Sequence, residues 1–361
     1  MDKSQYIKIQ NFRCFKELEV NGFKRINLIG GKNNAGKTSL LEALLIYFYP
    51  IAESIRLLKE NRKESLNRIR KAPKDAWNSI FYGQNIENNL LVEGYFKNIG
   101  NQTIKVSVSY SLQSQIFEDE DENFENNLGS PTTTLEIEQI LNEKNSIKRN
   151  LRATNKGLSL TKSEYLNDYK SSIPFLPSST MSNPNYGIKI AKQYDKVDYN
   201  RKSGEVLKIL KILDPSITGL VTYSFVEPTL YIQTKNQPRG LPISLFGDAV
   251  YRVTAIILEL LDQEDKVLFI DEIENGIHYT NQQSFWQGLF TLAEELDTLI
   301  FATTHSLEMI KAFAEAGKNF PDQGTYFELA YSPRTDNIVA INRDIDLLEY
   351  DLEHGKAIRG E

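Results

Sequence analysis

The sequence predicts an α/β protein with a mixed β-sheet core, an antiparallel β subdomain and a helical insertion. Three segments carry this prediction, at residues 25–49, 267–272 and 299–306. In each of them a short apolar run, typical of a buried strand, ends in residues that can bind or react with a ligand. Buried parallel strands deliver their carboxyl ends to the ligand crevice of such a sheet. The chemistry of this protein is therefore expected where these three segments end.

The composition limits the class of protein. The chain has 361 residues, of which 40% are apolar and 25% are charged, as in an ordinary soluble globular protein. Its single cysteine, Cys14, excludes an intramolecular disulfide and a cysteine–zinc cluster. A net charge of −6 argues against a protein that simply coats nucleic acid, so any contact with DNA would be a local patch.

The apolar stretches of the sequence bear on the cellular location of the protein. The chain begins Met-Asp-Lys without the apolar core of a signal peptide. No run of about 18 apolar residues is present, and the richest stretch, Leu40–Tyr49, is better interpreted as a buried helix. We expect a cytoplasmic protein with no membrane partner.

The first half of the chain predicts short strands around one long helix. Ile7 and Ile9 alternate with polar neighbours, and an apolar run at 25–29 ends at Gly30. A helical pattern runs from Lys37 to Tyr49, before Pro50. The remaining elements expected here are a strand at 18–20, a charged helical region at 53–74 with eight Lys or Arg against three Glu, and antiparallel strands at 90–96 and 103–111.

The second half predicts the rest of the sheet and its covering helices. Residues 118–125 are acidic and 171–195 are rich in Ser, Pro and Asn, so both are expected to be loops. The elements expected beyond them are an amphipathic helix at 203–213, strands at 219–225 and 229–234, a helix at 249–261 that follows residues 244–247, buried strands at 267–270 and 299–302, and a hairpin of 326–330 with 338–341.

Residues 31–38 fit the phosphate-loop pattern G-x-x-x-x-G-K-[ST] at every fixed position. Glycines allow backbone N–H groups to turn toward phosphates, and the following helix N-terminus favours an anion. Lys37 can reach the β- and γ-phosphates, and the hydroxyl of Thr38 can bind Mg²⁺. The residues expected to bind nucleotide here are Gly31, Asn33, Asn34, Ala35, Gly36, Lys37, Thr38 and Ser39.

Two further strand ends carry candidate catalytic groups. Residues 267–270 are apolar and lead directly into Asp271 and Glu272. At this position Asp271 would hold Mg²⁺ directly or through water, and Glu272 would polarise the attacking water. His305 follows the apolar run 299–302, and a neutral imidazole there can donate a hydrogen bond to a γ-phosphate.

Residues 244–248 (SLFGD) precede a predicted helix. A serine hydroxyl and a glycine amide at a helix N-terminus form an anion site. A plain helix cap explains the same residues, so this segment alone leaves both interpretations open.

In this order the motifs resemble those of the ABC-type P-loop ATPases of the SMC, RecF and OLD group, above all the OLD-like AAA ATPases of bacteria that lack a nuclease domain. The resemblance covers about residues 5–310, with a variable region between about 55 and 200. The segments that carry it are IKIQNFRCFKELEV, INLIGGKNNAGKTSLLEAL, LPISLFGDAVYRV, VLFIDEIENGIHY and TTHS. It implies a single ABC-type ATPase domain of residues 1–361, with a variable helical and β insertion at about 53–200.

The resemblance also implies the identity of the nucleotide and the role of each residue at its phosphates. The nucleotide would be ATP, with Mg²⁺. Lys37 and Thr38 would bind phosphate and metal, and Asp271 would be the Mg²⁺ aspartate. Glu272 would be the catalytic base, and His305 the switch that senses the γ-phosphate.

Further roles concern the second subunit and the edges of the site. Ser244 and Gly247 would contact the γ-phosphate of ATP bound to a second subunit, in a homodimer or higher oligomer that sandwiches ATP. Arg13 would lie near the nucleotide. Asn275 and His278 would lie at the subunit junction. Gln84 is the candidate for the Q-loop glutamine, although an ordinary exposed loop residue fits equally well.

Two features depart from the group. The signature segment lacks the double glycine of transporter ATPases. OLD nucleases carry a metal-dependent nuclease domain after the ATPase, but only 56 residues follow His305 here, predicted as a hairpin and an acidic tail. Any nuclease would therefore be a separate polypeptide. The first hypothesis is an ATP-driven switch that controls such a partner effector, by analogy in defence against phage or foreign DNA.

Three other functions remain open. The basic residues between 56 and 74 could follow a phosphate backbone, as in a DNA-repair or DNA-end-binding ATPase of the RecF or SMC kind. The subunit of a membrane transporter is disfavoured by the N-terminal NFRCF element and the atypical signature. A GTPase or small-molecule kinase is disfavoured because the sequence has no N-K-x-D element to recognise guanine.

Overall fold

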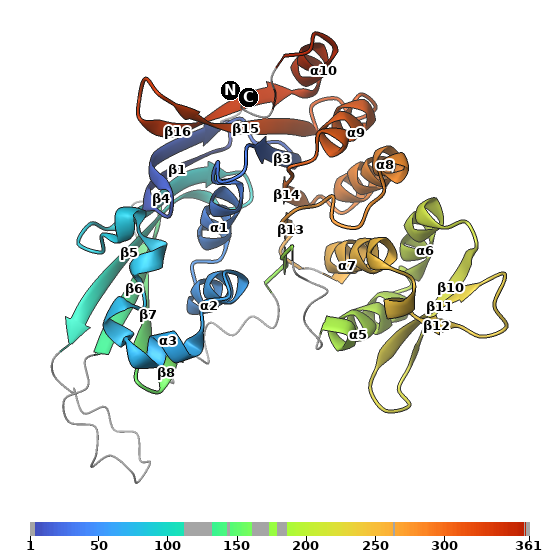
Figure 1. Ribbon diagram of the computed structural model, residues 1–361, viewed down its shortest axis with the longest axis horizontal. Coiled ribbons are helices and arrows are strands. Elements are labelled where there is room, and N and C mark those ends of the chain that lie inside the picture. Colours follow the sequence, from blue (N-terminus) through green and yellow to red (C-terminus); the bar gives the residue numbers. More distant parts are fainter. Residues whose placement is uncertain are drawn as a thin grey trace. The chain divides into compact units, whose positions relative to one another are not determined.

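A computed structural model describes residues 4–111, 132–142, 145–160, 173–178, 186–262, 264–356 and 358. The chain forms two compact units, and each is described by itself (Figure 1). The first unit comprises residues 1–21, 42–173 and 332–339, and the second comprises residues 22–41, 174–331 and 340–361. The expected insertion at 53–200 coincides with neither unit.

An antiparallel sheet dominates the first unit, with the strand order β2-β1-β4-β5-β6-β7-β8. Its strands are β1 (Tyr6–Phe12), β2 (Phe15–Asn21), β4 (Leu90–Phe96), β5 (Gly100–Ser111), β6 (Thr132–Leu141), β7 (Asn145–Thr154) and β8 (Gly157–Leu160). Ile7 and Ile9 are fully buried while Lys8 between them is exposed, as the alternation of a strand with one covered face requires. The antiparallel pairing of β4 with β5 confirms the predicted antiparallel subdomain.

Helices pack on this sheet within the first unit. They are α2 (Ala52–Asn61), α3 (Leu66–Lys71) and the short η1 (Pro73–Asp75), η2 (Asn78–Ile80) and η3 (Tyr82–Gln84). The second half of α1 (Lys37–Phe48) joins them through Tyr47, whose ring packs against Phe96 and whose carbonyl accepts from Gln102 Nε2 at 2.6 Å. The charged region 53–74 is thus two helices separated by a turn.

The second unit is built on a sheet with the strand order β16-β15-β3-β14-β13-β9. Its strands are β3 (Ile26–Gly31), β9 (Phe175–Leu176), β13 (Val267–Ile270), β14 (Leu299–Thr303), β15 (Gly324–Ser332) and β16 (Asn337–Asp344). β14 pairs in parallel with both β3 and β13, so the carboxyl ends of these three strands meet at one edge. This edge is where the sequence places its candidate site residues.

Helices and a small sheet complete the second unit. The helices are α5 (Tyr186–Tyr199), α6 (Ser203–Leu213), η5 (Ile243–Leu245), α7 (Asp248–Asp262), α8 (Tyr279–Glu295), α9 (Leu307–Gly317) and α10 (Ile345–Glu353). The small antiparallel sheet consists of β10 (Ile217–Tyr223), β11 (Thr229–Thr234) and β12 (Leu241–Pro242). Among the described residues, no helix is long and apolar enough to span a membrane.

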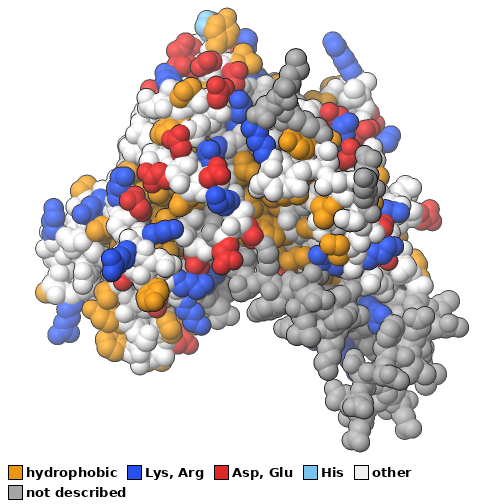
Figure 2. Space-filling model, turned by 180° about the vertical axis from the view of Figure 1, so that it is seen from behind, with side chains coloured by type: hydrophobic (Ala, Val, Ile, Leu, Met, Phe, Trp, Pro, Cys, Tyr) orange, Lys and Arg blue, Asp and Glu red, His pale blue; other side chains and the backbone are white. Residues whose placement is uncertain are grey.

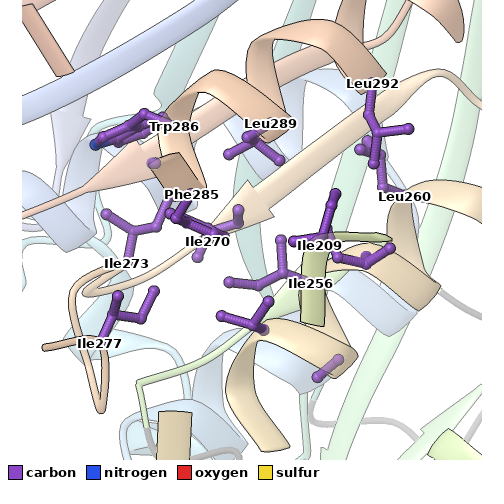
Figure 3. Packing of buried hydrophobic residues seen from close by; sticks show 14 of the residues in the cluster. Ile209, Ile256, Leu260, Ile270, Ile273, Ile277, Phe285, Trp286, Leu289 and Leu292 are labelled. Atoms are coloured by element: carbon purple, nitrogen blue, oxygen red, sulfur yellow. The ribbon is translucent and has the colours of Figure 1, made fainter. Parts of the chain in front are cut away.

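The core of the second unit lies directly behind the end of β13. Figure 3 shows Ile270 packed among apolar side chains from α6, α7 and α8, including Ile209, Ile256 and Phe285. Ile273 joins the same cluster from the segment that follows Asp271. All five side chains are at most 3% exposed. This packing makes the strand end that carries Asp271 a rigid support.

Several local predictions differ from the structure. Residues 186–195 were expected in a loop but form most of α5, because Ile190, Ala191 and Tyr194 bury one helix face. The segment after His305 contains α9 and α10 in addition to the two expected strands β15 and β16. The acidic stretch 118–125 lies outside the described residues.

Candidate nucleotide-binding site

The phosphate loop connects β3 to α1 through a backbone that only some residues can adopt. Gly31 and Gly36 have φ values of +136° and +94°, and Asn34 has a φ of +64°. A side chain on Gly31 would place its Cβ 2.4 Å from the carbonyl oxygen of Leu329 on the neighbouring strand β15. The loop therefore needs glycine at Gly31 both for the positive φ and for the close approach of β15.

Lys37 folds back over this loop. Its Nζ donates hydrogen bonds of 2.9 Å to the carbonyls of Gly31 and Lys32. Burial lowers the pKa of Lys37, while the negative charges of Glu274, Asp271 and Glu272 oppose that shift. These contacts hold a positive charge at the mouth of the loop, where phosphates bind in proteins with this motif.

Asp271 is the point at which the three strand ends converge. Its Oδ1 accepts hydrogen bonds from the hydroxyls of Thr38 at 3.1 Å and Thr303 at 2.7 Å. Asp271 is 8% exposed. The structure thus brings together Thr38 and Asp271, the two predicted Mg²⁺ residues, at the end of β13.

Glu272 stands beside this carboxylate in a fixed orientation. Its backbone has a φ of +51°, and its N–H donates to Thr303 Oγ1 at 2.8 Å. One of its carboxylate oxygens accepts from Asn275 Nδ2 at 3.0 Å. A strained, left-handed backbone held by neighbours is typical of functional positions. These contacts fix both the backbone and the carboxylate of Glu272.

His305 lies at the same edge, two residues after β14 ends at Thr303. Its backbone N–H and its ring Nδ1 lie 2.7 Å and 2.9 Å from Oε1 of Glu274. No role was expected for Glu274 from the sequence motifs. The sequence does show a third carboxylate, three residues after Asp271. It does not show that this carboxylate contacts His305, which lies 31 residues further along the chain.

Arg252 of α7 supports Asp271 from behind. Its Nη1 donates to the carbonyl of Pro177 at 2.6 Å and its Nη2 donates to the carbonyl of Asp271 at 2.7 Å. Arg252 is 2% exposed, and burial lowers its pKa while the charges of Tyr186 and Asp271 raise it. The sequence did not predict a role for Arg252 or Thr303, because nothing in their own segments shows that they contact Asp271.

The signature segment, residues 244–248, runs from η5 to the start of α7 in the second unit. Ser244 and Gly247 are both exposed, and Gly247 has a φ of +81° with open space where a Cβ would lie. Gly276, in the segment after Glu272, packs tightly on the start of α7: its Cβ would lie 2.9 Å from Ala249 N. The two segments assigned to the subunit junction therefore touch within one chain.

Arg13 and Gln84 belong to the first unit, so they are described with that unit. Arg13 is nearly buried: its Nε donates to Glu42 Oε2 at 3.1 Å and its Nη1 donates to the carbonyl of Ser79 at 2.8 Å. Gln84 is exposed and lines a cavity of about 340 Å³, together with Glu64 and Arg68. Their predicted roles at the nucleotide stay predictions.

The second unit contains the donor set that Mg²⁺ and a nucleoside triphosphate require. The loop between Gly31 and Gly36 has the glycine-dependent backbone of a phosphate cradle. Thr38 and Asp271 offer two oxygens to one cation, and oxygen is the ligand atom that Mg²⁺ prefers. The residues present fit both groups.

Comparison with known proteins also indicates a nucleotide-binding protein. The sequence model of a family described as "AAA domain, putative AbiEii toxin, Type IV TA system" matches residues 26–311. A protein of Helicobacter pylori named ATP/GTP phosphatase is 25% identical over 351 residues, which is 90% of this chain and 91% of the relative.

Two further matches cover a part of the chain and the whole fold. The DNA replication and repair protein RecF of Clostridium kluyveri is 34% identical over 109 residues, which is 28% of each protein. The solved structure of an SMC head bound to the C-winged helix domain of ScpA aligns with a TM-score of 0.51 at 12% identity, and covers 97% of this chain and 99% of that one. The structural match shows the fold that the two share.

Proposed function

We propose that this chain is a switch driven by ATP. It belongs to the AAA-domain family whose model matches residues 26–311, and it is an ABC-type P-loop ATPase of the SMC and RecF group. In this proposal two subunits close around ATP, and hydrolysis releases them. The observation that carries it is the convergence of the Thr38 and Thr303 hydroxyls on Oδ1 of Asp271.

The residues divide the chemistry among them. Lys37 and the loop amides bind the phosphates, and Thr38 and Asp271 hold Mg²⁺. The metal supplies positive charge that offsets the charge on the phosphoryl oxygens. Glu272, held by Thr303 and Asn275, orients the attacking water. His305 contacts the γ-phosphate and reports its presence.

Dimerisation is supported by the exposure of the signature segment. Ser244 and Gly247 are accessible at the start of α7, as an anion site offered to a second subunit must be. Gly276 links this segment to Glu272 by packing on Ala249. ATP bound across two subunits would then connect the signature of one with the catalytic residues of the other.

The output of the switch is proposed to be a partner protein, such as a separately encoded nuclease, in bacterial defence against phage or foreign DNA. The resemblance to OLD-like ATPases without a nuclease domain and the toxin–antitoxin wording of the family description support this role. Both are analogies at the level of the family.

The test is ATP turnover and mass in solution for the wild type and for Glu272→Gln, with and without ATP and Mg²⁺. Wild-type protein is expected to hydrolyse ATP, and Glu272→Gln is expected to lose about 100-fold or more in kcat and to gain mass with ATP. Glu295→Gln, at an exposed carboxylate of α8, is the matched control. Normal hydrolysis by Glu272→Gln would remove the assignment of the catalytic base.

A second candidate function is a DNA-end-binding or DNA-repair ATPase, supported by the local similarity to RecF. The basic stretch supports it less, because Arg56 pairs with Glu53 and Arg62 pairs with Glu42. On the face in Figure 2, acidic and basic side chains of the described residues are intermixed.

The DNA hypothesis is tested by duplex affinity at two salt concentrations. A variant in which Lys63, Lys71 and Lys74 are changed to Glu reverses charge at three exposed positions of this stretch. If the stretch follows phosphates, the variant binds more weakly and shows a smaller dependence on salt. Equal affinity for the two proteins would exclude the stretch as a DNA site.

A further inference from the structure

Glu274 and His305 form a close pair at the edge of the second unit's sheet. A single oxygen, Glu274 Oε1, lies 2.7 Å from the backbone N of His305 and 2.9 Å from its ring Nδ1. The Glu274 side chain is 9% exposed, whereas that of His305 is 52% exposed. The buried carboxylate thus holds an accessible ring at two points, which fixes both its position and its orientation.

The identity of the partner determines where the ring proton lies. An ionised carboxylate can only accept hydrogen bonds, so Nδ1 of His305 must be the donor in this contact. A neutral imidazole has one N–H, and that proton is then on Nδ1. Nε2 is left with a lone pair and is the ring atom that remains to meet a ligand.

The positive charge of Lys37 acts on Glu274. Among the charges that act on Lys37, that of Glu274 has the largest effect, followed by Asp271 and Glu272. Oε2 of Glu274 is buried and has no hydrogen-bond partner among the described residues. A buried carboxylate oxygen of this kind is costly unless a positive charge compensates it, and Lys37 supplies that charge.

We propose that Glu274 is a positioning residue that sets the tautomer of His305. The catalytic part of this inference rests on the proposed function, in which His305 meets the γ-phosphate. With its proton on Nδ1, a neutral His305 accepts a hydrogen bond at Nε2 and cannot donate one there. The ring donates to a phosphate oxygen from Nε2 only as the imidazolium, which carries a proton on both nitrogens. The sequence predicted that neutral His305 donates a hydrogen bond to the γ-phosphate. In this proposal the neutral ring accepts at Nε2 instead.

The tautomer is measured directly by NMR of protein labelled with ¹⁵N-histidine, without nucleotide. The chain has three histidines, so three ring spin systems are expected, and His305→Gln assigns the one of interest. At about pH 8.5, above the usual titration range of histidine, wild-type His305 should show an N–H signal at Nδ1 and an unprotonated Nε2. In Glu274→Gln the amide can donate or accept, so the ring should shift toward the Nε2–H form.

Glu308→Gln is the matched control, because Glu308 is a nearby carboxylate that accepts from Ser306 Oγ rather than from the ring. It should keep the wild-type pattern, and the signals of His278 and His354 report on the fold of every variant. A wild-type ring protonated at Nε2, or an unchanged His305 spectrum in Glu274→Gln, would overturn the proposal.

The catalytic consequence is measured separately. Glu274→Gln should lower kcat for ATP by about tenfold, with a smaller change in KM, as for other residues that orient a catalytic group. If the tautomer changes but kcat does not, the proposed role in catalysis is wrong. If the wild type itself does not hydrolyse ATP, the proposed function fails, and the NMR result still decides the assignment of the tautomer.

Discussion

Oγ1 of Thr303 donates a 2.7 Å hydrogen bond to Oδ1 of Asp271, although the two residues are 32 positions apart in the chain. The parallel register of β13 and β14 explains this contact, because Ile270 pairs with Ala302 and the next residue on each strand is then brought level. Thr303 also accepts from the backbone N–H of Glu272. One hydroxyl therefore holds the carboxylate of Asp271 and the backbone of Glu272.

Replacing Thr303 with Val should lower kcat for ATP by about tenfold, because the β-branched shape is kept while both hydrogen bonds are lost. Thr303→Ser retains the hydroxyl and should restore most of the rate. The measurement is steady-state hydrolysis with separate kcat and KM. Wild-type kcat in Thr303→Val would show that the hydroxyl plays no part in the reaction.

Arg252→Met should both destabilise the protein and slow hydrolysis. The guanidinium donates to the carbonyls of Pro177 and Asp271, and each hydrogen bond from a charged group is worth about 1.5–3 kcal/mol. Arg252→Lys should recover only part of this loss, because an ammonium lacks the fork that reaches both carbonyls. Chemical denaturation measures the free energy of unfolding, and Arg239→Met, at an exposed loop arginine, should leave it unchanged.

Two glycine substitutions should have opposite consequences. Gly31→Ala places a Cβ 2.4 Å from the carbonyl oxygen of Leu329 at a φ of +136°, so it should cost about 1–3 kcal/mol of stability and weaken ATP binding. Gly204→Ala, in helix α6, meets no atom within 4 Å and should stabilise by up to about 1 kcal/mol. Thermal unfolding and nucleotide titration of both variants test the pair, and equal behaviour would contradict the steric argument.

The stability of the first unit should decrease in acid because of Glu64. Burial raises the pKa of this carboxyl, but the hydrogen bond and charge of Lys59, with Ser79 and Arg13, outweigh it and lower the pKa. A carboxyl with a lowered folded-state pKa stabilises above its ordinary value of about 4.5 and loses that contribution as pH falls through the folded-state pKa.

Glu64→Gln tests this expectation. It leaves Lys59, which is 2% exposed, without its carboxylate, so it should cost about 3 kcal/mol at pH 7 and flatten the loss of stability between about pH 5 and pH 3. Denaturant unfolding at a series of pH values is the measurement. A variant as sensitive to acid as the wild type would assign the effect to other carboxyls.

The parts of the fold that sequence predicted well are those with a strong local pattern. The strands around Ile26–Gly31 and Val267–Ile270 and the helix that begins at Lys37 all formed as expected. Helix α5 was missed because Ser, Pro and Asn dominate the residues before it, whereas its buried face depends on helices and strands far along the chain. Helices α9 and α10 were missed although each has a local signal, an N-cap side chain at Ser306 and at Asp344 followed by apolar residues at helical spacing.

The sequence by itself determined the chemical groups of the site. A loop such as Gly31–Thr38, or an apolar strand that ends in Asp271, is specified by neighbouring residues through backbone conformation and burial. Only the tertiary structure decided which of these groups meet. The order β3-β14-β13 in one parallel sheet brings Thr38 to Asp271 across 233 residues, and brings Glu274 to His305 across 31. Such contacts depend on strand order and register, which arise from packing over the whole unit rather than from local spacing.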